Sequence, residues 1–218
     1  MRLLWCFLLC SVFLIAGCEK NRLNQPSYLN FSWRFTENSN SIVTLSGGKF
    51  TATQISILGD RIEGEDIDIN QTLPGVETSF STDNALNFQI DVPVGEYLSF
   101  VSSLKMAATT TAAVTLNGLL NKGNGVFVPV RIELSEADLL NFVSQQTFKL
   151  TKKHTYSVYL QLVVSELFQG ITNDMWAGAL LTNEPTGGPT LVISEQSNHP
   201  LYDHINSRLS KALTLSVD

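Results

Sequence analysis

Three histidines are the first candidates for chemistry, because imidazole can bind a metal ion or transfer a proton near neutral pH. His199 and His204 lie five residues apart with Asp203 between them, and His154 stands in the polar stretch TKKHT. A spacing of five places two helical side chains poorly for one metal ion, and the HExxH motif is absent. We therefore expect surface histidines and no histidine metal site.

Carboxylates and an amide alternate in the segment Asp66-Ile67-Asp68-Ile69-Asn70. Oxygen ligands at alternate positions of a strand could hold Ca²⁺. The segment lacks the glycine and the distal glutamate of an EF-hand loop. The alternating isoleucines already indicate a half-buried strand with a wet face, so we expect no metal here.

Catalytic and sugar-binding signatures are weak. The GxSxG, Walker and dinucleotide-binding motifs are absent, so the sequence favours a protein that is not an enzyme and holds no cofactor. Trp33 and Trp176 could form a platform for a sugar ring, together with tyrosines 28, 97, 156, 159 and 202. Both tryptophans lie on apolar stripes, which favours core packing.

The three cysteines, Cys6, Cys10 and Cys18, all lie within or next to one apolar run. Arg2 precedes this run, and residues 3–16 carry no charge. The run has the length of the hydrophobic region of a signal peptide and is shorter than the roughly 20 residues of a spanning helix. Because the rest of the chain has no cysteine, disulfides, zinc–thiolate sites and cysteine nucleophiles are not expected there.

The run ends in Leu14-Ile15-Ala16-Gly17-Cys18, which resembles the lipobox of bacterial lipoproteins. This resemblance implies cleavage by signal peptidase II between Gly17 and Cys18. Cys18 would then carry a diacylglyceryl group on its thiol and a fatty acyl chain, such as palmitate, on its new amino group. The alternatives are an ordinary secretory signal and an uncleaved anchor. The predicted organisation is a signal peptide over residues 1–17, a lipidated cysteine and flexible tether over 18–30, and one domain over 31–218.

Two short stretches resemble lipoproteins of Bacteroidota-type bacteria. Glu19 and Lys20 are similar to the charged starts of some exported lipoproteins, and VPVGEYLSF (residues 92–100) is similar to a turn and strand of their β-sandwiches. The implied location is the cell envelope, at the outer membrane. The net charge of −6 argues against nucleic acid as a partner.

Alternation of apolar and polar residues dominates the chain from residue 31 and predicts many short strands. Gly47-Gly48 and Gly59-Asp60 are expected as hairpin turns. Pro74-Gly75 and Pro93–Gly95 are expected as further breaks, and Pro129 indicates an edge strand or a bulge. A final strand is expected in LTLSV, residues 213–217.

Helical spacing occurs in three places. SEADLLNFV (residues 135–143) begins with a capping signal. The segment 165–181 has apolar residues at helical intervals and is expected to break near Gly170 and Asn173. The segment 199–213 places Leu201, Ile205 and Leu209 on one face, and we expect this helix to dock on the sheet with the Tyr202 hydroxyl in water.

Many strands and few helices favour a mainly β fold, a β-sandwich with two or three short peripheral helices. The predicted function is a non-enzymatic envelope lipoprotein with a binding or structural domain for an unknown protein or glycan ligand, held to the membrane through Cys18. One alternative is an anchor or assembly subunit of a surface fibre or adhesin. Another is an outer-membrane carbohydrate-binding protein or hydrolase.

Overall fold

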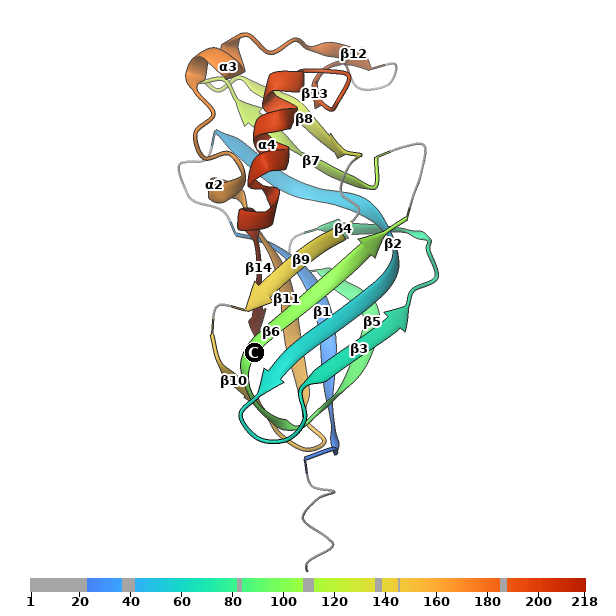
Figure 1. The fold of residues 1–218 in the computed structure, drawn as a ribbon. Helices are drawn as coiled ribbons and strands as arrows, with labels where there is room; N and C mark the ends of the chain where they lie inside the picture. The colour runs from blue at the N-terminus through green and yellow to red at the C-terminus, as the bar shows by residue number, and fades with distance from the viewer. Residues whose placement is uncertain are drawn as a thin grey trace, which may run out of the picture.

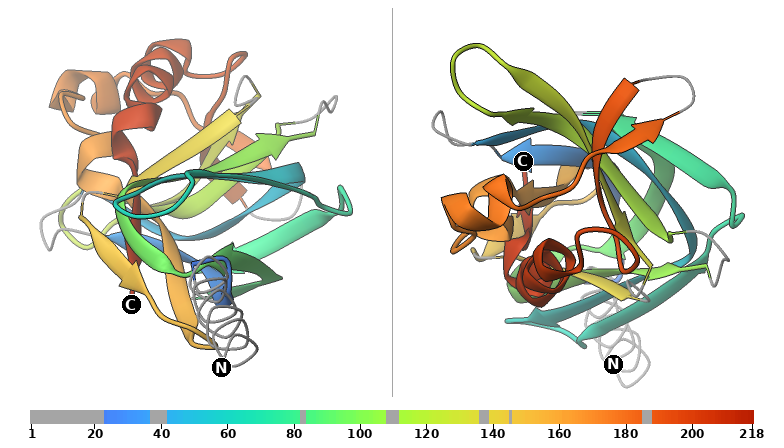
Figure 2. Two further views of the ribbon diagram at one scale, coloured as in Figure 1. Left: turned by 60° about the horizontal axis from the view of Figure 1, so that its bottom comes forward. Right: turned by 90° about the horizontal axis from the view of Figure 1, so that it is seen from above.

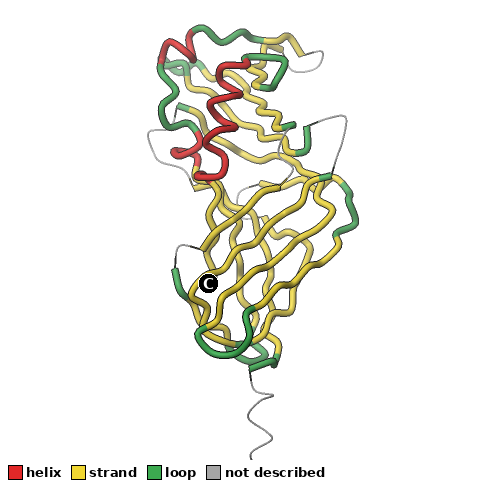
Figure 3. The backbone as a smooth tube through the Cα atoms, viewed as in Figure 1, coloured by secondary structure: helices red, strands yellow, loops and turns green. Residues whose placement is uncertain are grey.

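The computed structural model describes residues 23–36, 42–81, 84–107, 112–135, 139–144, 146–184 and 188–218. Strands make up most of this part of the chain, and the helices are few (Figures 1 and 3). The strands are β1 (Pro26–Thr36), β2 (Val43–Arg61), β3 (Ile67–Thr72), β4 (Glu77–Ser81), β5 (Asn84–Pro93), β6 (Gly95–Met106), β7 (Val114–Asn121), β8 (Phe127–Leu134), β9 (Leu139–Ser144), β10 (Phe148–Leu150), β11 (Thr155–Val163), β12 (Thr182–Glu184), β13 (Gly188–Ile193) and β14 (Leu213–Val217). The helices are α2 (Val164–Leu167), α3 (Asn173–Ala177) and α4 (His199–Ala212).

All the strands join in one mixed sheet. Its main path runs β12-β13-β8-β7-β2-β6-β9-β14-β11-β1-β5, with β10 beside β6 and with β3 and β4 beside β2. The sheet curls into a half-barrel in the lower part of Figure 1, and Figure 2 shows the helices grouped on one side of the upper part. The prediction of a mainly β fold with two or three short helices is confirmed, since the described residues form three. The finer prediction of a β-sandwich, two sheets packed face to face, is not.

The 19-residue strand β2 connects the upper and lower parts of the molecule. Its first half pairs with β7 and β4, and its second half pairs with β6 and β3. The hairpin turns predicted at Gly47-Gly48 and Gly59-Asp60 are therefore wrong, because both pairs lie inside this strand.

Close packing explains the strand glycines that resembled turns. A Cβ atom on Gly48 would lie 2.2 Å from the Thr115 carbonyl oxygen, and a Cβ atom on Gly59 would lie 2.8 Å from the Tyr97 ring. Glycine in a strand interior often marks such a close approach rather than a reversal. The chain reverses instead at residues 62–66, after β2 ends at Arg61.

The core lies inside the curled sheet. It is formed by the inward-facing apolar side chains, which alternate with outward-facing residues along each strand. Trp33 lies at its centre and contacts several phenylalanine rings, with ring-centroid distances from 4.3 Å to Phe80 to 6.3 Å to Phe35. Phe50 and Phe142 complete this cluster. Side chains from β1, β2, β4 and β9 thus meet in one aromatic cluster, as the alternation predicts.

The helices follow the predicted pattern in two of three places. The segment 165–181 is broken into α2 and α3 near the expected positions, since Gly170 has φ +92° and α3 begins at Asn173. Helix α4 covers residues 199–212 as predicted. The helix predicted over residues 135–143 is wrong, because Leu139–Ser144 form β9, which pairs with β6 and β14. Sheet pairing on both sides outweighs the local helical spacing there.

Two other boundaries differ from the prediction. Residues 26–30 belong to β1 rather than to the predicted tether over 18–30, because they pair with β5 and, from Tyr28, with β11. Pro129 lies in β8, which has β7 on one side and β13 on the other and is no edge strand. The proline stands directly before Val130, where pairing with β13 begins. No helix in the described ranges is long and apolar enough to cross a membrane.

Candidate functional site

The residues predicted for lipidation and cleavage, Leu14, Ile15, Ala16, Gly17 and Cys18, lie outside the described residues. The first described residue, Leu23, lies close to the start of β1 and to the turn between β5 and β6. Its carbonyl oxygen accepts a hydrogen bond of 2.9 Å from Arg61. The chain therefore enters the fold at the lower end of the half-barrel (Figure 1).

The Asp66–Asn70 segment is a hydrogen-bonded surface in this structure. Asp66 Oδ1 accepts from the Arg61 backbone N–H at 2.9 Å. Asn70 donates to Asp68 at 2.8 Å and accepts from Ser56 at 2.6 Å. One oxygen of Asp66, one of Asp68 and the amide oxygen of Asn70 thus accept hydrogen bonds from neighbours on β2 and β3. Among the described residues, no group of three or more His, Cys, Asp or Glu side chains could hold a metal ion.

The three histidines differ in exposure and in their contacts. His154 and His199 are exposed, and His199 faces Asp203 with a nitrogen–oxygen distance of 3.4 Å. His204 is half-buried, and its Nε2 lies 2.7 Å from the Gln169 carbonyl oxygen. His204 therefore helps to link α4 to the turn after α2.

The two tryptophans proposed as a sugar platform are not brought together. Trp33 is 1% exposed and lies in the aromatic core. Trp176 is 7% exposed, lies on α3 and packs against Phe168 with ring centroids 5.8 Å apart. Tyr202 is buried as well, and its hydroxyl lies 3.4 Å from the Ser135 hydroxyl. The expectation that this hydroxyl reaches water is wrong.

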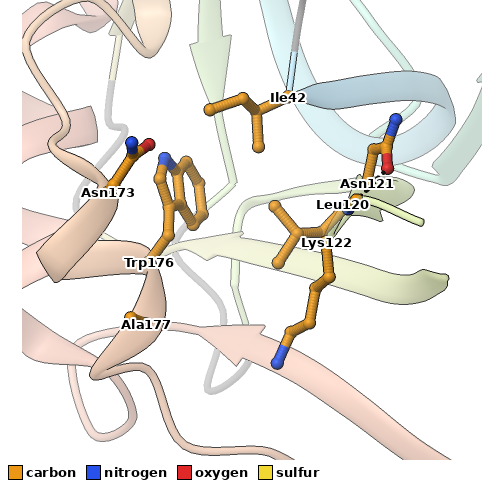
Figure 4. Close-up of a pocket in the computed structure, with 8 residues that line it drawn as sticks. Ile42, Leu120, Asn121, Lys122, Asn173, Trp176 and Ala177 are labelled. Carbon is orange, nitrogen blue, oxygen red and sulfur yellow. Dashed lines mark hydrogen bonds between the residues drawn. The ribbon is translucent and has the colours of Figure 1, made fainter. Parts of the chain in front are cut away.

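Trp176 instead forms one wall of a pocket of about 410 Å³ between α3 and the ends of β2 and β7. Figure 4 shows its indole facing Leu120 and Ile42 across the pocket. The pocket is lined by Ile42, Leu120, Asn121, Lys122, Gly123, Asn173, Trp176 and Ala177. The volume is in the range of small-ligand sites, which are mostly apolar with a few polar groups.

Local contacts hold the walls of this pocket in place. The Thr172 hydroxyl caps α3 by accepting from the Met175 backbone N–H at 3.3 Å. On the opposite wall, the Asn121 N–H donates to the Ile42 carbonyl at 2.8 Å, and the Asn121 side chain accepts from the Gly123 N–H at 2.9 Å. These hydrogen bonds hold the backbone segments that carry the apolar side chains of both walls.

A second pocket, of about 680 Å³, lies on the outer face of β2, β7 and β8 and is mainly polar. Four of its five charged side chains form ion pairs, and the fifth, Glu195, accepts a hydrogen bond from the Ser135 hydroxyl at 3.4 Å. Lys49 lies 2.9 Å from Glu77, and Arg131 lies 2.7 Å from Glu133. Because these pairs satisfy one another, this pocket offers less to a ligand than the Trp176 pocket does.

The lower end holds the most unusual polar groups. The Arg61 side chain donates to the carbonyl oxygens of Leu23, Glu65 and Val94, at 2.9, 2.5 and 3.1 Å, and the residue is only 8% exposed. Beside it, Tyr97 donates to the Pro93 carbonyl at 2.6 Å. Burial raises the pKa of Tyr97 to about 12, and the Arg61 charge lowers the pKa by a smaller amount.

Several of these residues were not singled out from the sequence. Ile42, Leu120 and Lys122 gave no signal beyond ordinary strand alternation and the turn that follows. Arg61 could have been noticed as a cation three residues before Gly64, where an added Cβ atom would lie 2.8 Å from the guanidinium. Comparisons with family models, with curated proteins and with solved structures found no match for this chain.

Proposed function

We propose that the protein is a lipid-anchored protein of the bacterial cell envelope whose β domain binds a ligand and catalyses no reaction. The anchor in this proposal is Cys18, at the end of the lipobox-like segment. The location we propose is the outer membrane. The ligand site we propose is the Trp176 pocket.

One observation carries the proposal: the chain enters the fold at one end, and the Trp176 pocket lies at the other. Leu23 is held beside Arg61 at the lower end of the half-barrel. Helix α3, which carries Trp176, lies at the upper end (Figure 1). Only four residues separate Cys18 from Leu23, so they span at most roughly 18 Å between the anchor and the fold. An anchored chain would thus present its pocket away from the lipid surface.

Replacing Cys18 with alanine tests the anchor. We expect the variant to incorporate no radiolabelled palmitate and to accumulate as the uncleaved precursor, because the thiol that receives the lipid is lost. Cys10→Ala is the matched control, since it removes a thiol from the same apolar run and should leave labelling unchanged. Continued labelling of the Cys18→Ala chain would refute the lipid anchor.

An assembly subunit of a surface fibre is the second candidate, and one feature favours it. Within the described residues, β3 pairs only with β2, and β5 pairs only with β1. Each strand therefore leaves one edge open, and an open edge can accept a strand from another chain. Extraction from the envelope as a ladder of stable oligomers would favour this candidate over a monomeric binding protein.

A carbohydrate-binding protein or hydrolase is less well supported. Such a protein needs exposed aromatic faces or carboxylates gathered in one cavity. Trp33 and Trp176 are nearly closed to solvent, and the Asp66–Asn70 surface lies on β3, away from α3 (Figure 1).

A further inference from the structure

We infer that the Trp176 pocket binds an amphipathic organic anion, a small aromatic or branched aliphatic group that carries a carboxylate or a similar acid. This inference rests on the proposed binding function and names the chemical class of its ligand. It follows from the shape of the apolar walls and from the charge at their edge.

The walls determine the apolar part of the ligand. Trp176 is 7% exposed and Leu120 is 2% exposed, so little of either side chain is open to solvent. Ile42, at 40% exposure, forms the part of the wall that a ligand could cover most. A sugar ring stacks on an open aromatic face, which Trp176 does not present. A compact apolar group placed between the indole, Leu120 and Ile42 (Figure 4) removes water mainly from Ile42, the most exposed of the three.

The lining determines the charge of the ligand. Lys122 is the one charged side chain among the eight lining residues, and none of the eight is acidic. Lys122 is exposed and follows β7 directly, and its stem runs along one side of the pocket in Figure 4. An anionic group at the mouth of the pocket would pair with this ammonium group, whereas a cationic group would be repelled by it.

The volume limits the size of the ligand. About 410 Å³ lies at the small end of ligand sites, which suits one ring or a short branched chain with its acid group and is too small for a long peptide. Because the Asn121 side chain already accepts from the Gly123 N–H, the polar contacts most available to the ligand are those with Lys122 and with the Asn173 amide beside Trp176 (Figure 4).

The test uses the full chain labelled with 5-fluorotryptophan and observed by ¹⁹F nuclear magnetic resonance. The chain has three tryptophans, Trp5, Trp33 and Trp176, and Trp→Phe variants assign their signals. The probes are 4-phenylbutyrate and its neutral counterpart 4-phenylbutyramide. We expect 4-phenylbutyrate to shift the Trp176 signal saturably and to leave the Trp33 signal in place, since Trp33 lies in the closed core.

Lys122→Gln tests the charge. We expect it to weaken 4-phenylbutyrate binding about two- to fivefold, as for an exposed ion pair, and to leave 4-phenylbutyramide binding unchanged. Lys105→Gln, an exposed lysine on β6, is the control and should change neither affinity. Leu120→Phe gives a second readout by filling the pocket, and it should weaken both probes.

Three results would overturn the inference. These are a Trp176 signal that neither probe moves, equal affinity for the acid and the amide, and an unchanged affinity in Lys122→Gln. A shift of Trp176 by maltose alone would point to a carbohydrate instead. A failure here would leave palmitate labelling of Cys18 unaffected, so the two proposals can fail separately.

Discussion

The two ends of the molecule are stabilised by different means. At the lower end, where the chain enters the fold, a buried guanidinium and a buried hydroxyl bind backbone carbonyl oxygens: Arg61 joins three segments, and Tyr97 closes a turn. At the upper end, α4 packs an apolar stripe onto the sheet, and α3 borders an open pocket. Directional polar contacts to backbone carbonyl oxygens join the segments of the lower end, whereas apolar packing joins those of the upper end. Each end also has a pocket: one of about 700 Å³ beside Leu23 and Val94, and one of about 410 Å³ beside Trp176.

The largest expected effect comes from the apolar packing of the upper end. Ile205 is fully buried in α4, between Leu201 and Leu209 on the same face. Ile205→Ala should lower the free energy of unfolding by about 2–5 kcal/mol, because it removes buried methyl groups and leaves a cavity. A denaturant titration measures this. Lys211→Ala, an exposed change in the same helix, is the control and should stay within about 0.5 kcal/mol of the parent.

The same titration shows whether the two ends unfold together. Strand β2 belongs to both ends, since its halves pair with β7 and with β6. One transition, followed alike by near-ultraviolet and far-ultraviolet circular dichroism, would mean that the ends form one cooperative unit. An unchanged midpoint for Ile205→Ala would mean that α4 adds nothing to the stability of the sheet, and the comparison between the ends would lose its basis.

An intermediate effect is expected from Arg61. Arg61→Gln should cost about 1.5–3 kcal/mol, because buried carbonyl oxygens lose hydrogen bonds to a charged donor. The effect should also be local. The Val94 N–H donates to the Gln25 carbonyl next to this site, so its hydrogen exchange should become faster, while amides of α4 keep their rates relative to global unfolding.

Lys105→Gln, on the exposed face of β6, is the matched loss of one positive charge without buried contacts. If Arg61→Gln and Lys105→Gln have the same stability, the guanidinium is not a structural clamp. In that case, the contrast between a polar lower end and an apolar upper end would rest on Tyr97 alone.

The regular parts of the fold could be predicted from the sequence, and the exceptions have a common cause. Alternation located the strands, and the spacing of Leu201, Ile205 and Leu209 located α4, because both patterns reflect which side of an element is buried. Gly47-Gly48 and Gly59 were misassigned as turns because local sequence does not show which backbone or ring lies opposite a glycine. The helix expected at 135–143 failed for the same reason, since its pairing partners, β6 and β14, are distant in sequence.

The candidate site was still less predictable. Trp176 was noticed as an aromatic residue on an apolar stripe, but the pocket depends on residues from three separated segments, including Ile42 and Leu120. Each of those two residues fits an ordinary strand pattern. Only the packing of α3 against the ends of β2 and β7 turns them into walls of a cavity.

The smallest effect on stability at neutral pH is expected from Tyr97→Phe. The difference in stability between the parent protein and this variant should change sign as the pH rises. Tyr97→Phe removes the hydrogen bond to the Pro93 carbonyl and should cost about 1 kcal/mol near pH 7. In the folded protein the pKa of Tyr97 is raised to about 12, above the value of about 10 for an exposed tyrosine. The unfolded chain therefore releases this proton first as the pH rises, which favours unfolding.

The parent protein should thus keep the stabilisation from the protonated Tyr97 hydroxyl below about pH 10, and should lose up to roughly 3 kcal/mol between about pH 10 and 12. The phenyl ring of the Tyr97→Phe variant does not titrate, so the stability curves of the two proteins should cross near pH 11, at about the midpoint of that interval. Urea titrations of both proteins at several pH values between about 8 and 12 measure the difference and cancel the titration of the other side chains. Parallel curves would mean that Tyr97 titrates as an exposed tyrosine does. The lower end would then be more open to water than the contacts of Arg61 and Tyr97 indicate.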